Sequence, residues 1–165
     1  MKSAHVRRAS LGIGLCAAVA STMVFADPLG QIRLAPADIV SSDHASAGPG
    51  TSGISAIRTT VLSGKPGQDG PYTIALHVPA HTTIAAHTHR DDRTAVVVSG
   101  TWWFGYGPAN DRNALKRLPA GSFYSEPAGV PHFARTGREP VVVFITGNGP
   151  SDTEYVDAGA NPARR

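Results

Sequence analysis

Short runs in which apolar and polar residues alternate recur along most of the chain. A period of two residues is typical of β-strands that bury one face, because successive side chains point to opposite sides of a sheet. Helical spacing is almost absent by comparison. The pattern predicts strands at residues 57–62, 72–78, 82–86, 94–99, 101–106, 122–125, 132–135 and 141–146, with a short late strand at 154–156.

The segments between these runs are rich in turn-forming residues. The chain contains 18 glycines and 13 prolines, which interrupt helices and suit tight turns. Residues 110–118 are the best helix candidate, with Leu115 and Leu118 three apart, but they can form only a turn or two. Many short strands separated by turns predict an all-β single domain of sandwich or barrel type.

The first 26 residues have the layout of a secretory signal peptide. Basic residues without any acid precede an apolar stretch, residues 11–25, and small residues lead to a cleavage site after Ala26. The stretch is shorter than the roughly 20 residues of a membrane-spanning helix, so we expect no stable membrane anchor after cleavage. The prediction is a periplasmic or secreted protein. Arg7 and Arg8 leave twin-arginine export open beside the general route.

The predicted signal peptide, or leader, changes how the net charge of the chain is interpreted. The chain has 15 Lys and Arg against 12 Asp and Glu, a net charge of +3 that by itself suggests an anionic partner such as nucleic acid. Three of the basic residues, and the only cysteine, Cys16, lie in the leader. The remaining chain is formally neutral and free of thiols, so we expect no nucleic-acid partner and no disulfide.

The chain thus divides into four predicted segments. Residues 1–26 are the signal peptide and residues 27–56 are an N-terminal arm with a flexible connector, because 41–53 is small and polar. Residues 57–156 form the β domain, and residues 157–165 form a C-terminal tail.

Three histidines are candidates for a metal site. His87 and His89 are two residues apart, so in a strand both imidazoles lie on one face and can reach one ion. His132 lies further along the chain. Three neutral nitrogen donors suit one divalent transition metal, Fe, Mn, Zn, Ni or Cu, with open coordination positions. A bare pair of this kind is a weak signal, so the surrounding residues decide the interpretation.

The residues around the first pair resemble the first motif of the cupin superfamily, G-x5-H-x-H-x3/4-E-x6-G. At the corresponding positions this chain has His81, His87, His89, Arg93 and Gly100. Both histidines and the last glycine match. His81 stands where the motif has its first glycine, and Arg93 stands where it has glutamate.

The second cupin motif, G-x5-P-x-G-x2-H-x3-N, is also present. Gly121, Pro127, Gly129 and His132 match it at the right spacing, and Thr136 replaces the final asparagine. The glycines and the proline suit the turn that brings His132 back toward the first pair.

The resemblance extends over residues 72–147, about half of the chain. It implies a cupin-type double-stranded β-barrel, similar to a jelly roll, in a single domain. It also implies that a metal lies inside the barrel, bound by His87, His89 and His132. A homodimer is compatible with the resemblance.

Arg93 is the departure with the largest chemical consequence. In cupins the glutamate that it replaces is usually a fourth, anionic ligand, whereas arginine stays protonated and cannot bind a metal. At about 6 Å and an effective dielectric near 20, its charge and a dication repel by about 5 kcal/mol. Three arrangements remain open. Arg93 turns away to pair with Asp91, Asp92 or another carboxylate; it points inward to bind an anionic ligand of the metal; or the barrel has lost its metal.

The aromatic run at 101–106 is the other candidate for ligand contact. Trp102 and Trp103 are adjacent, so one faces the interior, and parity alone does not say which. Trp102 and Tyr106, together with Arg93, are candidate substrate-binding residues, although core packing is the simpler role for the aromatics.

Two functions fit these features. The first is an exported metal enzyme, an oxygenase, isomerase or lyase, that acts on a small anionic or enolisable molecule. The second is a non-catalytic module that binds a small ligand or a metal as a sensor or scavenger. The three histidines favour the enzyme and the missing glutamate favours the module. No residue is assigned a catalytic role.

Overall fold

The computed structural model of the chain describes residues 30–42, 45 and 47–164. The predicted signal peptide and its cleavage site lie outside the described residues. Among the residues that are described, no helix is long and apolar enough to cross a membrane.

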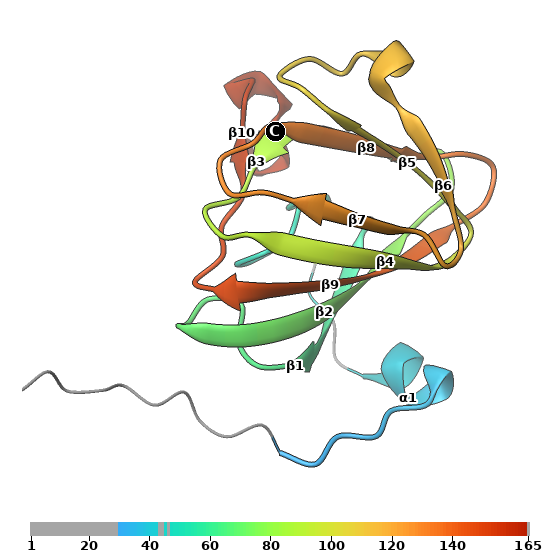
Figure 1. Cartoon of the computed structure of the whole chain (residues 1–165), viewed down its shortest axis with the longest axis vertical. Coiled ribbons are helices and arrows are strands. Elements are labelled where there is room, and N and C mark those ends of the chain that lie inside the picture. Colours follow the sequence, from blue (N-terminus) through green and yellow to red (C-terminus); the bar gives the residue numbers. More distant parts are fainter. Residues whose placement is uncertain (1–29, 43–44, 46, 165) are drawn as a thin grey trace, which may run out of the picture.

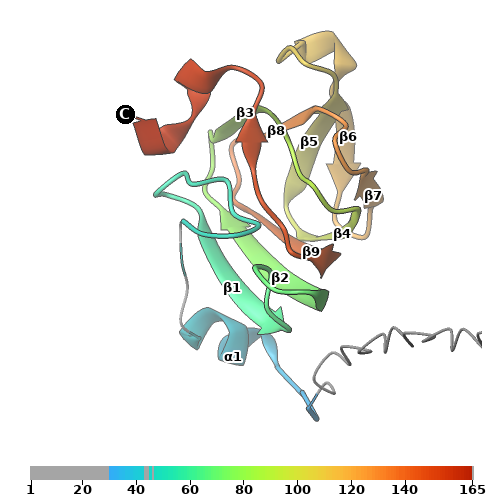
Figure 2. The same ribbon diagram turned by 90° about the vertical axis from the view of Figure 1, so that its left-hand side faces the viewer.

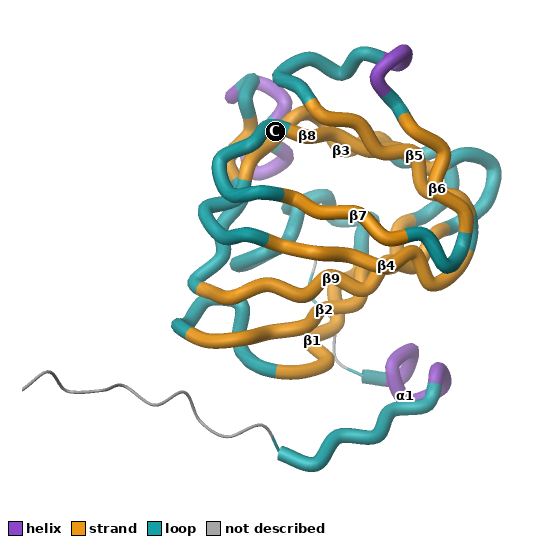
Figure 3. Tube along the Cα trace, viewed as in Figure 1, coloured by secondary structure: helices purple, strands orange, loops and turns teal. Residues whose placement is uncertain are grey.

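Two five-stranded antiparallel sheets face each other and enclose the core (Figures 1 and 3). The first sheet contains, in spatial order, β1 (Arg58–Ser63), β2 (Gly70–Val78), β9 (Val141–Gly149), β4 (Arg93–Ser99) and β7 (Phe123–Glu126). The second contains β10 (Glu154–Tyr155), β3 (Thr83–Thr88), β8 (His132–Thr136), β5 (Thr101–Tyr106) and β6 (Lys116–Pro119). This is the all-β, single-domain double-stranded barrel that the sequence predicts.

Alternation along each strand builds the core between the sheets. Residues of β2, β4 and β9 that are two apart, such as Val141 and Val143, are fully buried. Trp102 of β5 faces inward and is 2% exposed, whereas Trp103 is only partly buried. Each large apolar side chain buried in this way contributes about 1.5–3 kcal/mol to folding.

Residues 110–118 do not form the helix that was the best candidate there. They form a single 3-10 turn, η1 (Arg112–Ala114), followed by β6. Pairing with β5 decides the outcome, because Leu118 lies opposite Trp102 and is buried in the core. Tertiary pairing therefore overrides a weak local preference.

Short helices lie outside the barrel (Figure 3). Helix α1 (Pro36–Ser41), which the sequence analysis did not predict, begins with a proline, and its Asp38 carboxylate accepts a hydrogen bond from the Ala35 backbone N–H at 2.7 Å. It lies below β1 in Figure 1. After β10 come two 3-10 turns, η2 (Ala158–Ala160) and η3 (Pro162–Arg164).

Gly147 of β9 occupies a position with no room for a side chain. A Cβ there would lie 2.5 Å from Asp91 Oδ2 and 2.6 Å from the Tyr72 hydroxyl. We expect Gly147→Ala to lower the free energy of unfolding by about 1–3 kcal/mol, because the buried Tyr72–Asp91 pair must move. Urea denaturation measures the change, and Gly137→Ala, whose Cβ would meet only Trp103 Nε1 at 3.9 Å, is the control. Equal midpoints for the two variants would contradict the expectation.

Candidate metal centre

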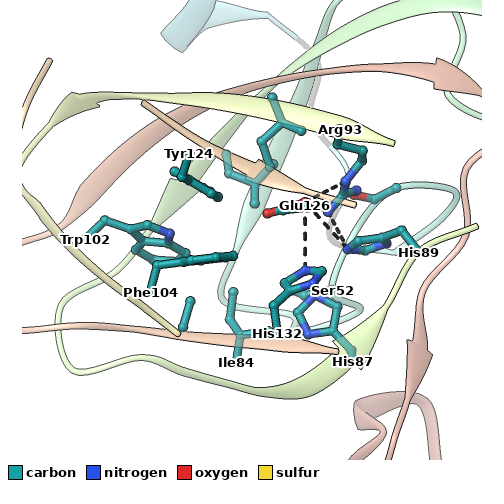
Figure 4. A pocket seen from close by; sticks show the side chains of 14 residues that line it. Ser52, Ile84, His87, His89, Arg93, Trp102, Phe104, Tyr124, Glu126 and His132 are labelled. Atoms are coloured by element: carbon teal, nitrogen blue, oxygen red, sulfur yellow. Dashed lines mark hydrogen bonds and ion pairs between the residues drawn. The ribbon is translucent and has the colours of Figure 1, made fainter. Parts of the chain in front are cut away.

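The three predicted histidines come together inside one end of the barrel (Figure 4). His87 lies near the end of β3 and pairs in register with His132, the first residue of β8, while His89 directly follows β3. One nitrogen from each ring lies within 4.8 Å of the others, and all three side chains are buried. Neighbouring strands thus supply a cluster that is distant in sequence.

Each imidazole is oriented by a hydrogen bond from its other nitrogen. A backbone carbonyl can only accept, so Nδ1 carries the proton in all three rings and Nε2 keeps its lone pair. The bonds run from Nδ1 of His87 to Ala85 O at 2.7 Å, of His89 to Asp152 O at 2.5 Å and of His132 to Val130 O at 3.0 Å. Backbone partners of this kind orient metal-binding histidines in proteins.

The Nε2 atoms test whether a metal fits this site. His132 Nε2 is buried and has no hydrogen-bond partner among the described residues. A buried acceptor without a partner costs free energy unless an ion or water satisfies it. The cavity at the cluster is narrow and has room for one small ion or water beside the three rings. The residues therefore fit a single metal ion.

A buried ion pair adjoins the cluster. Arg93, the first residue of β4, lies directly opposite Glu126, the last residue of β7. Arg93 Nε donates to Glu126 Oε2 at 2.6 Å, and its Nη2 also contacts that oxygen. Nη2 contacts His89 Nε2 as well. Arg93 thus has a carboxylate partner without turning away from the histidines.

Glu126 faces two of the histidines. Its Oε2 lies 3.9 Å from His89 Nε2 and 3.8 Å from His132 Nε2 (Figure 4). From the sequence, Glu126 is one of several possible acid/base groups near the motifs, and nothing local distinguishes it from a packing or loop residue. One signal was available: Glu126 is two positions from Tyr124, and a strand that buries one of them also buries the other.

Burial and the ion pair set the charges of the site. Burial lowers the pKa of His87 to about 4 and that of His89 to about 2, so both rings are neutral at pH 7. Burial alone would raise the pKa of Glu126, but the charge of Arg93 and the interactions with the three histidines together outweigh it and lower that pKa to about 2. Burial alone would lower the pKa of Arg93, but the attraction and hydrogen bond to Glu126, together with attraction to Tyr72 and Asp91, outweigh it and raise that pKa. The site without metal therefore contains one anion, one cation and neutral rings.

These shifts predict that the metal-free protein loses stability in acid. An unfolded histidine binds a proton below about pH 6.5, whereas folded His87 stays neutral down to about pH 4. In that range the unfolded chain holds more protons, so stability falls as the pH falls. Below about pH 4.5, Glu126 adds to the loss as its unfolded form takes up protons.

Urea midpoints of the chelator-treated protein between pH 7.5 and 4.5 measure this effect. We expect a decreasing midpoint, and a flatter profile for His87→Gln. A wild-type midpoint that is constant or rises toward acid would contradict the prediction.

A segment that precedes β1 covers the site. We call residues 50–53 the strap; Figure 2 shows the loop that contains it above β1. Three side chains of the barrel donate hydrogen bonds to its carbonyls. These bonds run from Thr153 Oγ1 to Thr51 O at 2.7 Å, from the Tyr155 hydroxyl to Ser52 O at 2.7 Å and from Arg93 Nη1 to Gly50 O at 3.3 Å. The last part of the predicted connector, 27–56, is thus bound to the barrel.

The candidate substrate-binding residues lie in different places. Arg93 and Trp102 line the same cavity as the histidines, together with Phe104 and Tyr124 (Figure 4). Tyr106 is 47% exposed, does not line this cavity, and donates a hydrogen bond from its hydroxyl to Ser125 O at 2.6 Å. Contact with a substrate stays a prediction for all three.

The fold and the buried cluster together define a cupin-type barrel with three histidines inside it. Solved structures with this fold are similar to the chain. The polyketide cyclase RemF from Streptomyces resistomycificus is 17% identical at a TM-score of 0.63, over 81% of this chain and 90% of that one. These values establish a shared fold and nothing more.

Two further solved structures are similar to the chain in fold. An RmlC-like cupin from Shewanella frigidimarina is 16% identical at a TM-score of 0.51, over 66% of this chain and 85% of that one. KdgF from a Halomonas species is 15% identical at a TM-score of 0.52, over 73% and 94%. No protein-family model matches the sequence, and no curated protein matches it. The cupin-type fold is therefore shown by structure.

Proposed function

We propose that this chain is an exported metal-binding protein with a mononuclear centre that acts on a small anionic or enolisable molecule, as an oxygenase, isomerase or lyase. The observation that carries the proposal is the convergence of three buried Nε2 atoms whose rings are oriented by backbone carbonyls. His87, His89 and His132 are the proposed ligands. When bound, a divalent transition metal would supply Lewis acidity or oxygen activation.

The chain's own groups favour an anionic partner for that metal. The three histidines are neutral, and the charges of Arg93 and Glu126 balance each other, so the positive charge of the ion is not neutralised. Apolar side chains that include Ile84 and Phe104 line the narrow cavity beside the histidines. A small ligand therefore suits the site better than a large one. Export rests on the predicted leader, residues 1–26, and a homodimer stays a prediction.

A second function, a non-catalytic metal or ligand module, has its own support. Glu126 is the one carboxylate that lines the cavity among the described residues, and Arg93 holds it in an ion pair. A carboxylate whose pKa is held near 2 is a weak general base at pH 7. The strap also covers the cluster. These features suit retention of an ion more than turnover.

Metal analysis of the purified protein tests the proposal. After reconstitution with Fe, Mn, Zn, Ni and Cu separately, we expect close to one ion per wild-type chain for at least one metal. We expect a near-complete loss in His87→Ala/His89→Ala. A metal-free wild type under all five conditions would overturn the proposal. Oxygen uptake or turnover with carboxylates, diketones and phenols would then separate the enzyme from the binding module.

A further inference from the structure

We propose that Glu126 is the carboxylate ligand of this metal centre and that the Arg93 guanidinium pairs with this carboxylate until an ion displaces it. This inference rests on the proposed function, because it concerns the same ion. It assigns a fourth ligand to β7, whereas the cupin motif has its glutamate on β4, at the position of Arg93.

The distances place a Glu126 oxygen among the histidine nitrogens. Donors bonded at about 2.1 Å to a tetrahedral ion lie roughly 3.4 Å from one another. Glu126 Oε2 is 3.9 Å and 3.8 Å from the Nε2 atoms of His89 and His132. These separations are a few tenths of an ångström wider than coordination requires, a gap that small side-chain rotations close. A carboxylate oxygen is a donor that divalent transition metals bind together with histidine nitrogens.

The register explains why the carboxylate comes from this strand. Arg93 and Glu126 lie directly opposite each other on β4 and β7, and both side chains point into the barrel. Placing a cation at the first-motif position and an anion at its cross-strand partner keeps one carboxylate in the site. It also leaves neither buried charge without a partner, which would be costly.

Arg93 and a metal compete for the same atoms. Nη2 of Arg93 contacts both His89 Nε2 and Glu126 Oε2, the two atoms that the ion would bind. A guanidinium cannot share a nitrogen lone pair with a dication, and the two positive charges repel. Metal loading therefore displaces Nη2 from both atoms.

Asp91 offers the displaced guanidinium a second partner. Its Oδ1 is buried and has no hydrogen-bond partner among the described residues, while its Oδ2 accepts from Tyr72. Asp91 Oδ2 lies 2.5 Å from the Cβ position of Gly147, and Gly147 pairs in register with Arg93. The carboxylate is thus next to Arg93 on the side away from Glu126's strand. It allows Arg93 to remain buried and paired while Glu126 binds the ion.

Binding of Co²⁺ and Zn²⁺ to paired variants tests the inference. Arg93→Met removes the competing cation, and Arg93→Met/Glu126→Gln differs from it only in the carboxylate. We expect Arg93→Met to bind more tightly than wild type, and the double variant to bind at least 10-fold more weakly than Arg93→Met. The visible absorption of bound Co²⁺ should also differ between the double variant and wild type, because the ligand set changes.

Two further variants keep the test decisive. Arg93→Glu/Glu126→Arg retains both charges, moves the carboxylate to β4 and should restore Co²⁺ binding to within about threefold of wild type. Glu154→Gln, at an exposed residue of β10, is the control, and its Co²⁺ affinity and absorption should equal those of wild type. If Arg93→Met does not fold, two measurements still test whether Glu126 binds the ion. These are the visible absorption of Co²⁺ bound to the double variant and the Co²⁺ affinity of Arg93→Glu/Glu126→Arg.

Identical Co²⁺ affinity and absorption in wild type and the double variant would overturn the inference while leaving the three-histidine site intact. A wild type that binds neither ion would overturn the proposed function, and this inference with it. The two failures are therefore distinguishable.

Discussion

Glu126→Ala is expected to lower the free energy of unfolding of the metal-free protein by about 3–5 kcal/mol. The substitution removes the carboxylate that the 3% exposed Arg93 side chain contacts, and Arg93 can pair with Asp91 only if it moves. The attraction that offsets its desolvation is lost, and such an uncompensated buried charge is among the costliest single changes in a protein core. Urea or guanidinium denaturation after chelator treatment measures the effect.

Two further variants show whether loss of the Arg93–Glu126 ion pair causes the destabilisation. Arg93→Met/Glu126→Leu removes both charges and should recover most of the loss, because apolar side chains of similar size replace a buried pair at little cost. Glu139→Ala, at an exposed residue, should change stability by no more than about 0.5 kcal/mol. A loss below about 1 kcal/mol in Glu126→Ala would show that Arg93 finds another partner readily, with Asp91 the nearest one.

The second large effect concerns the stability that a bound metal provides. At a free concentration 100 times the dissociation constant, an ion that binds only the folded state adds about 2.7 kcal/mol to the free energy of unfolding. We expect wild type to show a metal-dependent rise in melting temperature, and His132→Ala to show none. His132 suits this test because its Nε2 is buried and has no hydrogen-bond partner among the described residues, so a bound ion is the group that would satisfy this nitrogen.

His77→Ala is the matched control for His132→Ala. His77 lies on β2, outside the cluster, and its removal should leave the metal-dependent rise unchanged. An equal rise in wild type and His132→Ala would mean that the ion binds elsewhere on the chain.

The fold was predictable because strand alternation is a local property. The runs at 101–106 and 141–146 are rich in aromatic and β-branched residues, and the strands appear there. The strand β6 was not predictable in the same way. Lys116–Pro119 has one buried residue and no β-branched residues, so only its pairing with β5 makes it a strand.

The site was predictable in part, for a related reason. The histidines belong to motifs whose spacing is visible along the chain. The partner of Arg93 depends on which residue of β7 lies opposite the start of β4, and that register is a product of the whole barrel. The contact of the strap with the site, through Arg93 and Gly50, joins positions 43 residues apart in the chain and leaves no local sequence signal.

The direct opposition of Arg93 and Glu126 has a consequence for how related chains diverge. An intermediate with two arginines or two glutamates at these positions would bury like charges side by side, so the two positions should change together across an alignment. Chains with arginine in the first motif are then expected to carry an acid immediately before the proline of the second motif. Searches that demand glutamate in the first motif would miss such barrels, and a pattern that couples the two positions would find them.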